Sequence, residues 1–121
     1  MTDELKQDFE SGMIKHVLFK SKLRSYLYGS QINQGPIRDP MQCALGHWIQ
    51  DRALGAYAHL PESRELDRLH KQIHQEANRL MDMHDRGETE QALGGLGAVE
   101  KLADQITGLM RTMEQKLRTG L

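Results

Sequence analysis

Histidines occupy positions in this sequence where a helix would normally bury an aliphatic residue. His16 falls on the apolar seam of the first predicted helix, and His70 falls on the seam of the third. His74 follows His70 by four residues, about one helical turn, so both imidazoles project from one face. A histidine pair with this spacing is a common chelate for a transition metal. An unpartnered buried imidazole costs free energy, so these positions require an explanation.

The single cysteine adds a second type of metal ligand. Cys43 follows Asp39-Pro40, a pair typical of a helix start. We expect it in the first turns of that short helix, where backbone N–H groups favour a thiolate. A thiolate and imidazoles are typical zinc ligands, and four of them complete a tetrahedron. His47 lies four residues after Cys43 and is a competing ligand. Taken singly, each candidate is also explained as a core residue, either a hydrogen-bonded histidine or a small buried thiol, and for His16 alone this is the favoured explanation.

Two further histidines are expected to be solvated. His84 lies near the seam of the third helix but close to its end, which favours partial exposure. His59 falls in a predicted loop. Neither position predicts a metal ligand.

Four segments carry helical periodicity, and none alternates with the period of a strand. The helices are predicted over residues 2–28, 40–54, 61–86 and 88–118, and a single long loop is predicted over residues 30–39. Gly94, Gly95 and Gly97 weaken the start of the fourth helix, and they are explained equally by close helix contact or by fraying. Three long helices and one short cysteine-bearing helix predict an all-α fold. The expected arrangement is an antiparallel four-helix bundle forming one domain over residues 1–121.

Composition excludes several classes of function. The chain has 121 residues and a net charge of −1, without the basic excess that nucleic-acid binding requires. No stretch approaches the roughly 20 apolar residues of a membrane span. The acidic, polar start is not typical of a signal peptide, and a lone cysteine forms no intrachain disulfide, so we expect a cytoplasmic protein. Lys15, Lys20, Lys22 and Arg24 are interpreted as a solvated helix face.

The six residues from Cys43 to Trp48 carry a resemblance to a known family. Their sequence, Cys-Ala-Leu-Gly-His-Trp, resembles the Cys-x-Leu-Gly-x-Trp signature of the chemoreceptor zinc-binding domain. The family's first ligand histidine precedes the cysteine, and its closing His-x-x-x-His pair follows. The resemblance covers about residues 11–84. It implies zinc as the cofactor and a ligand set of His16, Cys43, His70 and His74, with His47 on a variable position of the signature.

The resemblance also implies a role. Domains of this family are bacterial, cytosolic regulatory modules of chemotaxis receptors and diguanylate cyclases. They form helical bundles, are often homodimers, and respond to zinc or to oxidants such as hypochlorous acid at the zinc-bound cysteine. No output domain follows the last helix, so the chain is expected to be either a stand-alone member or part of a longer signalling protein.

Three alternatives differ in what the metal does. A purely structural or interaction bundle would use zinc as a staple without sensing. A hemerythrin-like di-iron bundle would need bridging carboxylates, but Lys20 stands four residues after His16 and Glu-x-x-His pairs are missing from the sequence. An enzyme is not expected, because we find no phosphate-binding loop, no nucleophile-and-base pair and no cofactor motif.

Overall fold

All regular secondary structure is helical among the residues that the structure describes. The computed structural model describes residues 3–120. Its elements are α1 (Asp3–Leu27), α2 (Gly35–Arg38), the 3₁₀ helix η1 (Pro40–Gln42), α3 (Ala44–Trp48), the π-helix η2 (Ile49–Ala56), α4 (Pro61–Asp85), α5 (Thr89–Gly94) and α6 (Leu96–Arg118). The prediction of an all-α fold is confirmed. Residue 2, where the first helix was predicted to begin, lies outside the described part.

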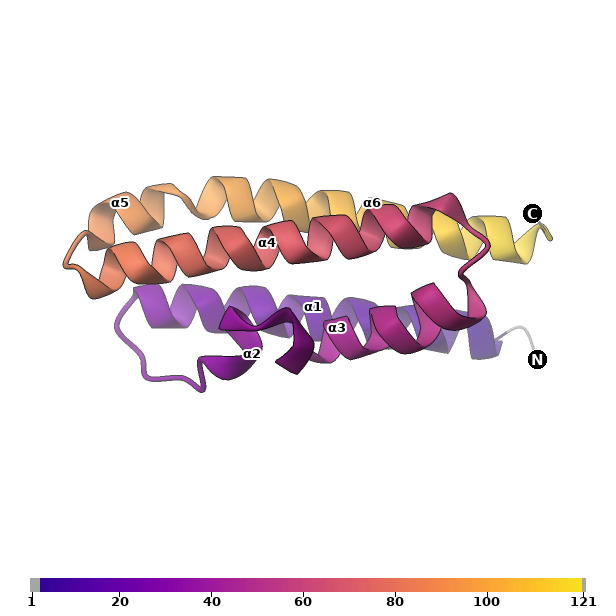
Figure 1. Ribbon diagram of the computed structural model, residues 1–121, viewed down its shortest axis with the longest axis horizontal. Coiled ribbons are helices and arrows are strands. Elements are labelled where there is room, and N and C mark those ends of the chain that lie inside the picture. The colour runs from indigo at the N-terminus through magenta and orange to yellow at the C-terminus, as the bar shows by residue number, and fades with distance from the viewer. Residues whose placement is uncertain (1–2, 121) are drawn as a thin grey trace.

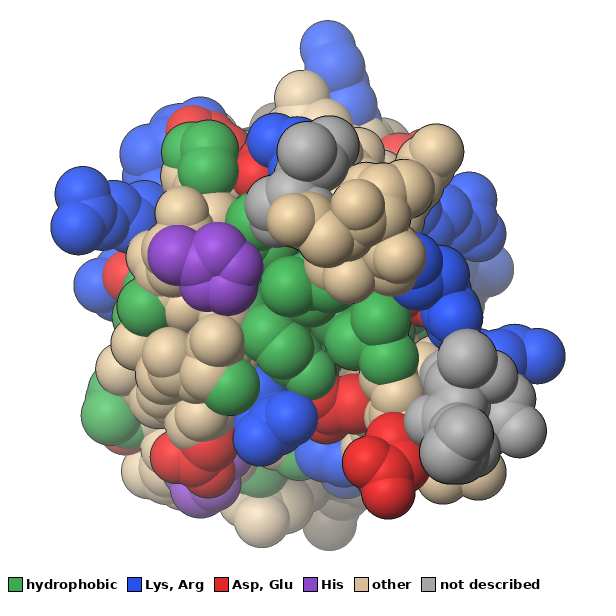
Figure 2. Space-filling model, turned by 90° about the vertical axis from the view of Figure 1, so that its right-hand side faces the viewer, with side chains coloured by type: hydrophobic (Ala, Val, Ile, Leu, Met, Phe, Trp, Pro, Cys, Tyr) green, Lys and Arg blue, Asp and Glu red, His purple; other side chains and the backbone are tan. Residues whose placement is uncertain are grey.

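The three long helices extend along the long axis of the molecule (Figure 1). α4 packs against α6, and α1 contacts both of them. The segment from α2 to η2 runs beside α1 and α4, and it contacts both helices. The core therefore lies between α1, α4, α6 and this shorter segment. Viewed from the end that holds both termini, hydrophobic side chains gather at the centre with charged side chains around them (Figure 2).

The buried side of each long helix follows the helical period. In α1, Phe9, His16, Leu23 and Leu27 are buried and Met13 is half-buried. In α4 the buried positions include Leu66, His70, Ile73, Ala77 and Leu80. Burying one large aliphatic side chain stabilises the folded state by about 1.5–3 kcal/mol, and this is the main stabilising contribution of such seams. Two buried histidines therefore occupy core positions that this pattern normally reserves for aliphatic residues.

The short cysteine-bearing helix was predicted as one continuous helix, and this prediction is wrong. Asp39 does cap a helix start, since its Oδ1 accepts a hydrogen bond of 2.9 Å from the Met41 amide. That helix is only the 3₁₀ turn η1, however, and Cys43 then adopts an extended conformation with φ −80° and ψ 134° before α3 begins. At this break the Pro40 carbonyl folds back against Gly46. A Cβ on Gly46 would lie 2.1 Å from that oxygen.

Two other boundaries differ from the predicted ones. The predicted loop over residues 30–39 contains the one-turn helix α2. The predicted fourth helix is interrupted at Gly95, between α5 and α6. A Cβ at Gly95 would lie 2.4 Å from Leu80 Cδ2, whereas Cβ atoms at Gly94 and Gly97 would meet nothing within 4 Å. Close helix contact therefore explains Gly95.

One carboxylate fastens the start of α1 to the cysteine-bearing segment. Asp8 accepts hydrogen bonds from Trp48 Nε1 at 2.9 Å, Arg52 Nε at 2.9 Å and the Tyr57 hydroxyl at 2.5 Å. Burial raises the pKa of Asp8, but the hydrogen bonds from these three donors outweigh it, so the net pKa lies below its ordinary value. Asp8 thus holds α3 and η2 against α1 in its charged form.

We predict that Asp8→Asn lowers the free energy of unfolding by about 1–3 kcal/mol near neutral pH, because hydrogen bonds to a charged group are lost. A lowered folded pKa gives stability that is present above the unfolded pKa and is lost as pH falls through the folded pKa. The difference in free energy of unfolding between Asp8→Asn and wild type should therefore narrow at about pH 3. Urea denaturation near neutral pH and at about pH 3 measures this difference. Asp51→Asn, at an exposed site, is the matched control, and an equal loss in that variant would contradict the assignment.

Candidate metal centre

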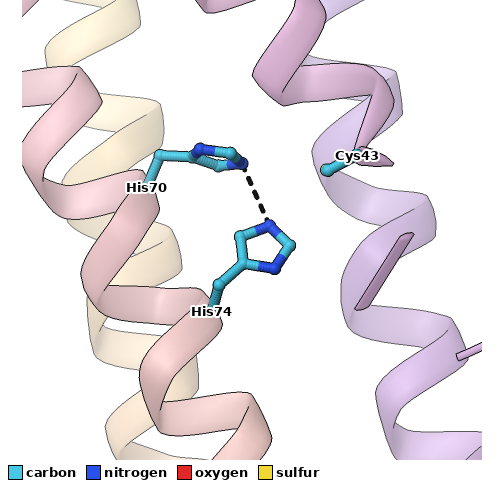
Figure 3. Close-up of side chains that lie close together, drawn as sticks. All are labelled: Cys43, His70 and His74. Atoms are coloured by element: carbon cyan, nitrogen blue, oxygen red, sulfur yellow. Dashed lines mark hydrogen bonds between the residues drawn. The ribbon is translucent and has the colours of Figure 1, made fainter. Parts of the chain in front are cut away.

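Two imidazoles from α4 converge inside the core. His70 and His74 are both almost fully buried, and their ring centroids lie 4.5 Å apart. Their Nε2 atoms face one another at 3.0 Å (Figure 3). The pair follows from the four-residue spacing, which places both side chains on the inner face of α4 one turn apart.

The tautomer of His74 is set by a backbone contact. His74 Nδ1 lies 2.6 Å from the Ile37 carbonyl oxygen, which can only accept, so Nδ1 carries the proton. Nε2 of the neutral ring is therefore left with a lone pair directed at His70. A metal ligand whose second ring nitrogen donates to a carbonyl is the usual arrangement around zinc. The geometry thus presents His74 Nε2 as an available ligand atom.

Cys43 approaches the same point from the other side. Its sulfur and one nitrogen from each of His70 and His74 all lie within 4.8 Å of one another, and all three residues are buried. In Figure 3 Cys43 lies opposite the two rings, across the space between α4 and the cysteine-bearing segment. One thiolate and two imidazoles are ligand types that zinc prefers. This group is the one set of three such ligands found among the described residues.

Gly46 permits this close approach. Beyond its contact with the Pro40 carbonyl, a Cβ at Gly46 would lie 3.0 Å from His70 Cε1. The absence of a side chain lets α3 pack directly on the His70 ring.

Burial keeps the histidines neutral. It is the largest cause that lowers the pKa of His70 to about 3, and nearby His74 and His16 lower it further. Burial also lowers the pKa of His74. Neutral imidazoles offer lone pairs, and metal binding requires that form. The group therefore fits a divalent cation without first losing protons from its rings at neutral pH.

His16 is buried beside this group but is not one of its three members. Its Nε2 is buried without a hydrogen-bond partner. Its ring lies parallel to Phe19, with centroids 6.2 Å apart, and the Phe19 ring lies 4.7 Å from that of His74. Burial first, then the charge of Lys20, lowers the pKa of His16 to about 4. A buried ring nitrogen without a hydrogen-bond partner is costly, and coordination of a metal ion would satisfy it. The role of His16 as the fourth ligand stays a prediction.

Comparison with known families gives one result. A model of the chemoreceptor zinc-binding domain matches residues 16–81, more than half of the chain. The chain belongs to this family. Comparisons with curated proteins and with solved structures give no match. The resemblance predicted from the cysteine signature is confirmed, and so is zinc as the cofactor, because the family binds zinc and the Cys43, His70 and His74 group can hold it.

Membership establishes the general class of the protein. Chemoreceptor zinc-binding domains are regulatory zinc-binding modules in chemoreceptor-type signalling, and they are not a catalytic family. Among the described helices, none has the length and apolar character that crossing a membrane requires.

The remaining histidines of this chemoreceptor zinc-binding domain lie away from the cluster. His47 is exposed, and its Nε2 contacts the Met41 carbonyl at 2.7 Å. His84 is half-buried, with Nδ1 at 2.9 Å from Thr89 Oγ1, and His59 is exposed. These positions agree with the expectations from the sequence.

Sequence reasoning missed the residues that position His74. The Arg38 guanidinium contacts Asp82 at 2.9 Å and Asp85 at 3.1 Å, and the Asn78 amide donates to the Arg38 carbonyl at 2.8 Å. These contacts hold α2 on α4 and so place the Ile37 carbonyl at His74 Nδ1. The only sequence signal was an arginine after Gly35-Pro36 in an apparent loop, which does not reveal a partner 40 residues away.

We predict that Arg38→Ala weakens zinc binding by about tenfold, as is typical when a partner of a ligand is lost, while the zinc content at saturation stays unchanged. Competition with a chromophoric chelator measures the affinity. Arg79→Ala, which removes another arginine that bonds within α4, is the matched control. Equal affinities of the Arg38→Ala protein and the wild type would show that α2 does not position His74.

Proposed function

We propose that this protein is a sensory or regulatory domain whose ligands are His16, Cys43, His70 and His74. It responds to zinc availability or to oxidation of the zinc-bound Cys43, and it signals by helix rearrangement to a partner or an attached output domain. The observation that carries this proposal is the buried cluster of Cys43, His70 and His74, which joins the cysteine-bearing segment to α4. Chemoreceptor and cyclase-type outputs are the partners that the family suggests.

The ligand set favours regulation over catalysis. Three imidazoles and one thiolate would fill a tetrahedral site, with no position left for a substrate or a reactive water. Bound zinc would supply a crosslink between α1, α4 and the cysteine-bearing segment. We infer that the protein is not an enzyme.

The segment that carries Cys43 is suited to move. Cys43 is an extended residue between the three-residue 3₁₀ turn η1, which is too short to be stable by itself, and α3, which continues directly into η2. Trp48, at the end of α3, contacts Phe9 of α1 edge to face at 5.1 Å. Oxidation of the Cys43 sulfur to a sulfenic acid would remove the thiolate ligand. Release of Cys43 would therefore alter the contact between α3 and α1.

We propose that α1, α4, α6 and the shorter segment from α2 to η2 form an antiparallel four-helix bundle. This bundle is a single domain over residues 1–121 in the cytoplasm. The helix order and the side-by-side course of α1, α4 and α6 support the bundle. The lone buried cysteine supports a reducing compartment.

A stripe on α1 supports the homodimer that the family suggests. Ile14, Val17 and Leu18 are 62%, 58% and 54% exposed, and their spacing places them on one face of α1. Apolar contact along this stripe thus favours a second copy of this chain on this face.

The dimer has a direct test. Val17→Glu should convert the protein from dimer to monomer in light scattering at micromolar concentration, while Met41→Glu, at another exposed apolar residue outside α1, should leave the dimer intact. A dimer that persists in Val17→Glu would place the interface elsewhere.

The sensing role is tested by zinc removal and by oxidant. We expect chelation, or hypochlorous acid at one equivalent, to change the emission of Trp48, the only tryptophan, and to change the oligomeric state or partner binding. Cys43→Ser should be insensitive to the oxidant. Fluorescence, helical content and assembly that do not change would leave zinc as a structural staple only.

A further inference from the structure

A cavity of about 160 Å³ opens beside Cys43. It lies between α1 and the segment from α2 to α3, and its apolar walls include Leu18, Phe19 and Ile37. Cys43 forms part of its lining although only 4% of the residue is exposed. At about 30 Å³ per water molecule, the cavity holds a molecule of a few heavy atoms. It offers a small reagent a route to a sulfur that is otherwise buried.

Two lysines give this cavity a positive charge. Lys15 and Lys22 both line it, seven residues apart on one face of α1, and no acidic side chain lines it. Among the described ion pairs, neither lysine has a carboxylate partner, and Lys15 Nζ contacts only the Ser11 hydroxyl at 2.8 Å. The neighbouring Lys20 and Arg24, in contrast, both lie within 4.0 Å of Glu100. The uncompensated charge of α1 is therefore concentrated at the cavity.

We propose that this cavity is an entry port that admits small anions to the Cys43 sulfur in preference to neutral molecules. A cleft of one sign of charge with apolar walls focuses its field and raises the local concentration of the opposite ion. The inference deepens the proposed sensing function, on which its biological role rests. It names the class of reagent that reaches the sulfur: small and anionic, rather than a bulky peptide thiol or disulfide.

The test compares two alkylating reagents of nearly equal size, anionic iodoacetate and neutral iodoacetamide. In both reactions the Cys43 sulfur bonds to the CH₂ carbon, iodide leaves, and a thioether remains. The chain has one cysteine, so mass spectrometry of the intact zinc-loaded protein reports Cys43 alone. The ratio of the two rates removes any change in sulfur reactivity or cavity opening that affects both reagents equally.

We expect Lys15→Gln with Lys22→Gln to lower the iodoacetate to iodoacetamide rate ratio about threefold to tenfold at low salt. Lys15→Arg with Lys22→Arg should keep the wild-type ratio, since the charges remain. The matched control, Lys6→Gln with Arg24→Gln, removes two charges from α1 outside the cavity and should also keep it. In wild type, 0.5 M salt should bring the ratio toward that of the Gln pair, because screening shortens the reach of the charges.

An unchanged rate ratio in Lys15→Gln with Lys22→Gln would overturn the proposed entry port. An equal fall of the ratio in the control variant would overturn it as well. Because this readout needs no change in fluorescence or assembly, it fails or succeeds independently of the sensing role. A port without sensing would give a charge-dependent ratio together with an unresponsive Trp48.

Discussion

Replacement of Gly46 by alanine is expected to weaken zinc binding at least tenfold and to lower stability by about 1–3 kcal/mol, the usual cost of overpacking a core. The new Cβ would lie 2.1 Å from the Pro40 carbonyl oxygen and 3.0 Å from His70 Cε1. The nearer atom belongs to the backbone, so relief requires η1 and α3 to separate. Cys43 stands between these two elements and would move with them, away from the histidines.

The sign of this effect distinguishes the account from helix propensity. Alanine is favoured over glycine inside a helix by about 1 kcal/mol, so propensity alone predicts that Gly46→Ala stabilises the protein. Gly108→Ala in α6 is the matched control, because its Cβ would meet nothing within 4 Å and only propensity acts there. Chelator competition and urea denaturation of both variants provide the measurement. A Gly46→Ala protein that binds zinc normally would refute the close packing of α3 on His70.

Zinc removal should have the second large effect, a loss of about 4 kcal/mol of stability when free zinc is initially near a thousand times its dissociation constant. Zinc binds the assembled cluster and not the separated ligands of the unfolded chain, so binding free energy becomes folding free energy. We expect His74→Ala to abolish this dependence, because it removes a proposed ligand and leaves the Ile37 carbonyl without its donor.

His84→Ala provides the comparison for that experiment. His84 also lies on α4 but bonds to Thr89 outside the cluster, so its loss should leave the zinc dependence intact. Thermal unfolding with zinc and with excess chelator gives the result. A zinc dependence that survives in His74→Ala, or disappears in His84→Ala, would contradict the assignment of the ligands.

The sequence predicts most of the helices because the long ones carry a strong apolar period. α4 was predicted over residues 61–86 and extends over Pro61–Asp85, since a proline start and a following glycine define its ends. The histidine pair was found for the same reason, because position on a seam can be read from spacing. The buried group that could hold a metal ion, Cys43, His70 and His74, contains three of the four predicted residues.

Features that depend on tertiary contact could not be predicted in this way. The break at Cys43 accompanies packing of the Pro40 carbonyl on Gly46, and no local pattern encodes that contact. The one-turn helix α2 is too short to show a period, and it is held in place by Arg38 and α4. The positive cavity at Cys43 needs the packing of α1 against this segment, so the lysines had been interpreted only as a solvated face.

The most direct test of the proposed zinc site is the metal content of the freshly purified protein. Native mass spectrometry measures it beside His16→Ala, Cys43→Ala and His74→Ala. We predict one zinc per chain in the wild type and a lost or much weakened zinc in all three variants. Zinc retained at full affinity in His16→Ala would reduce the ligand set to the three residues that the structure brings together. A wild type that contains no zinc and takes up none on titration would contradict the central claim.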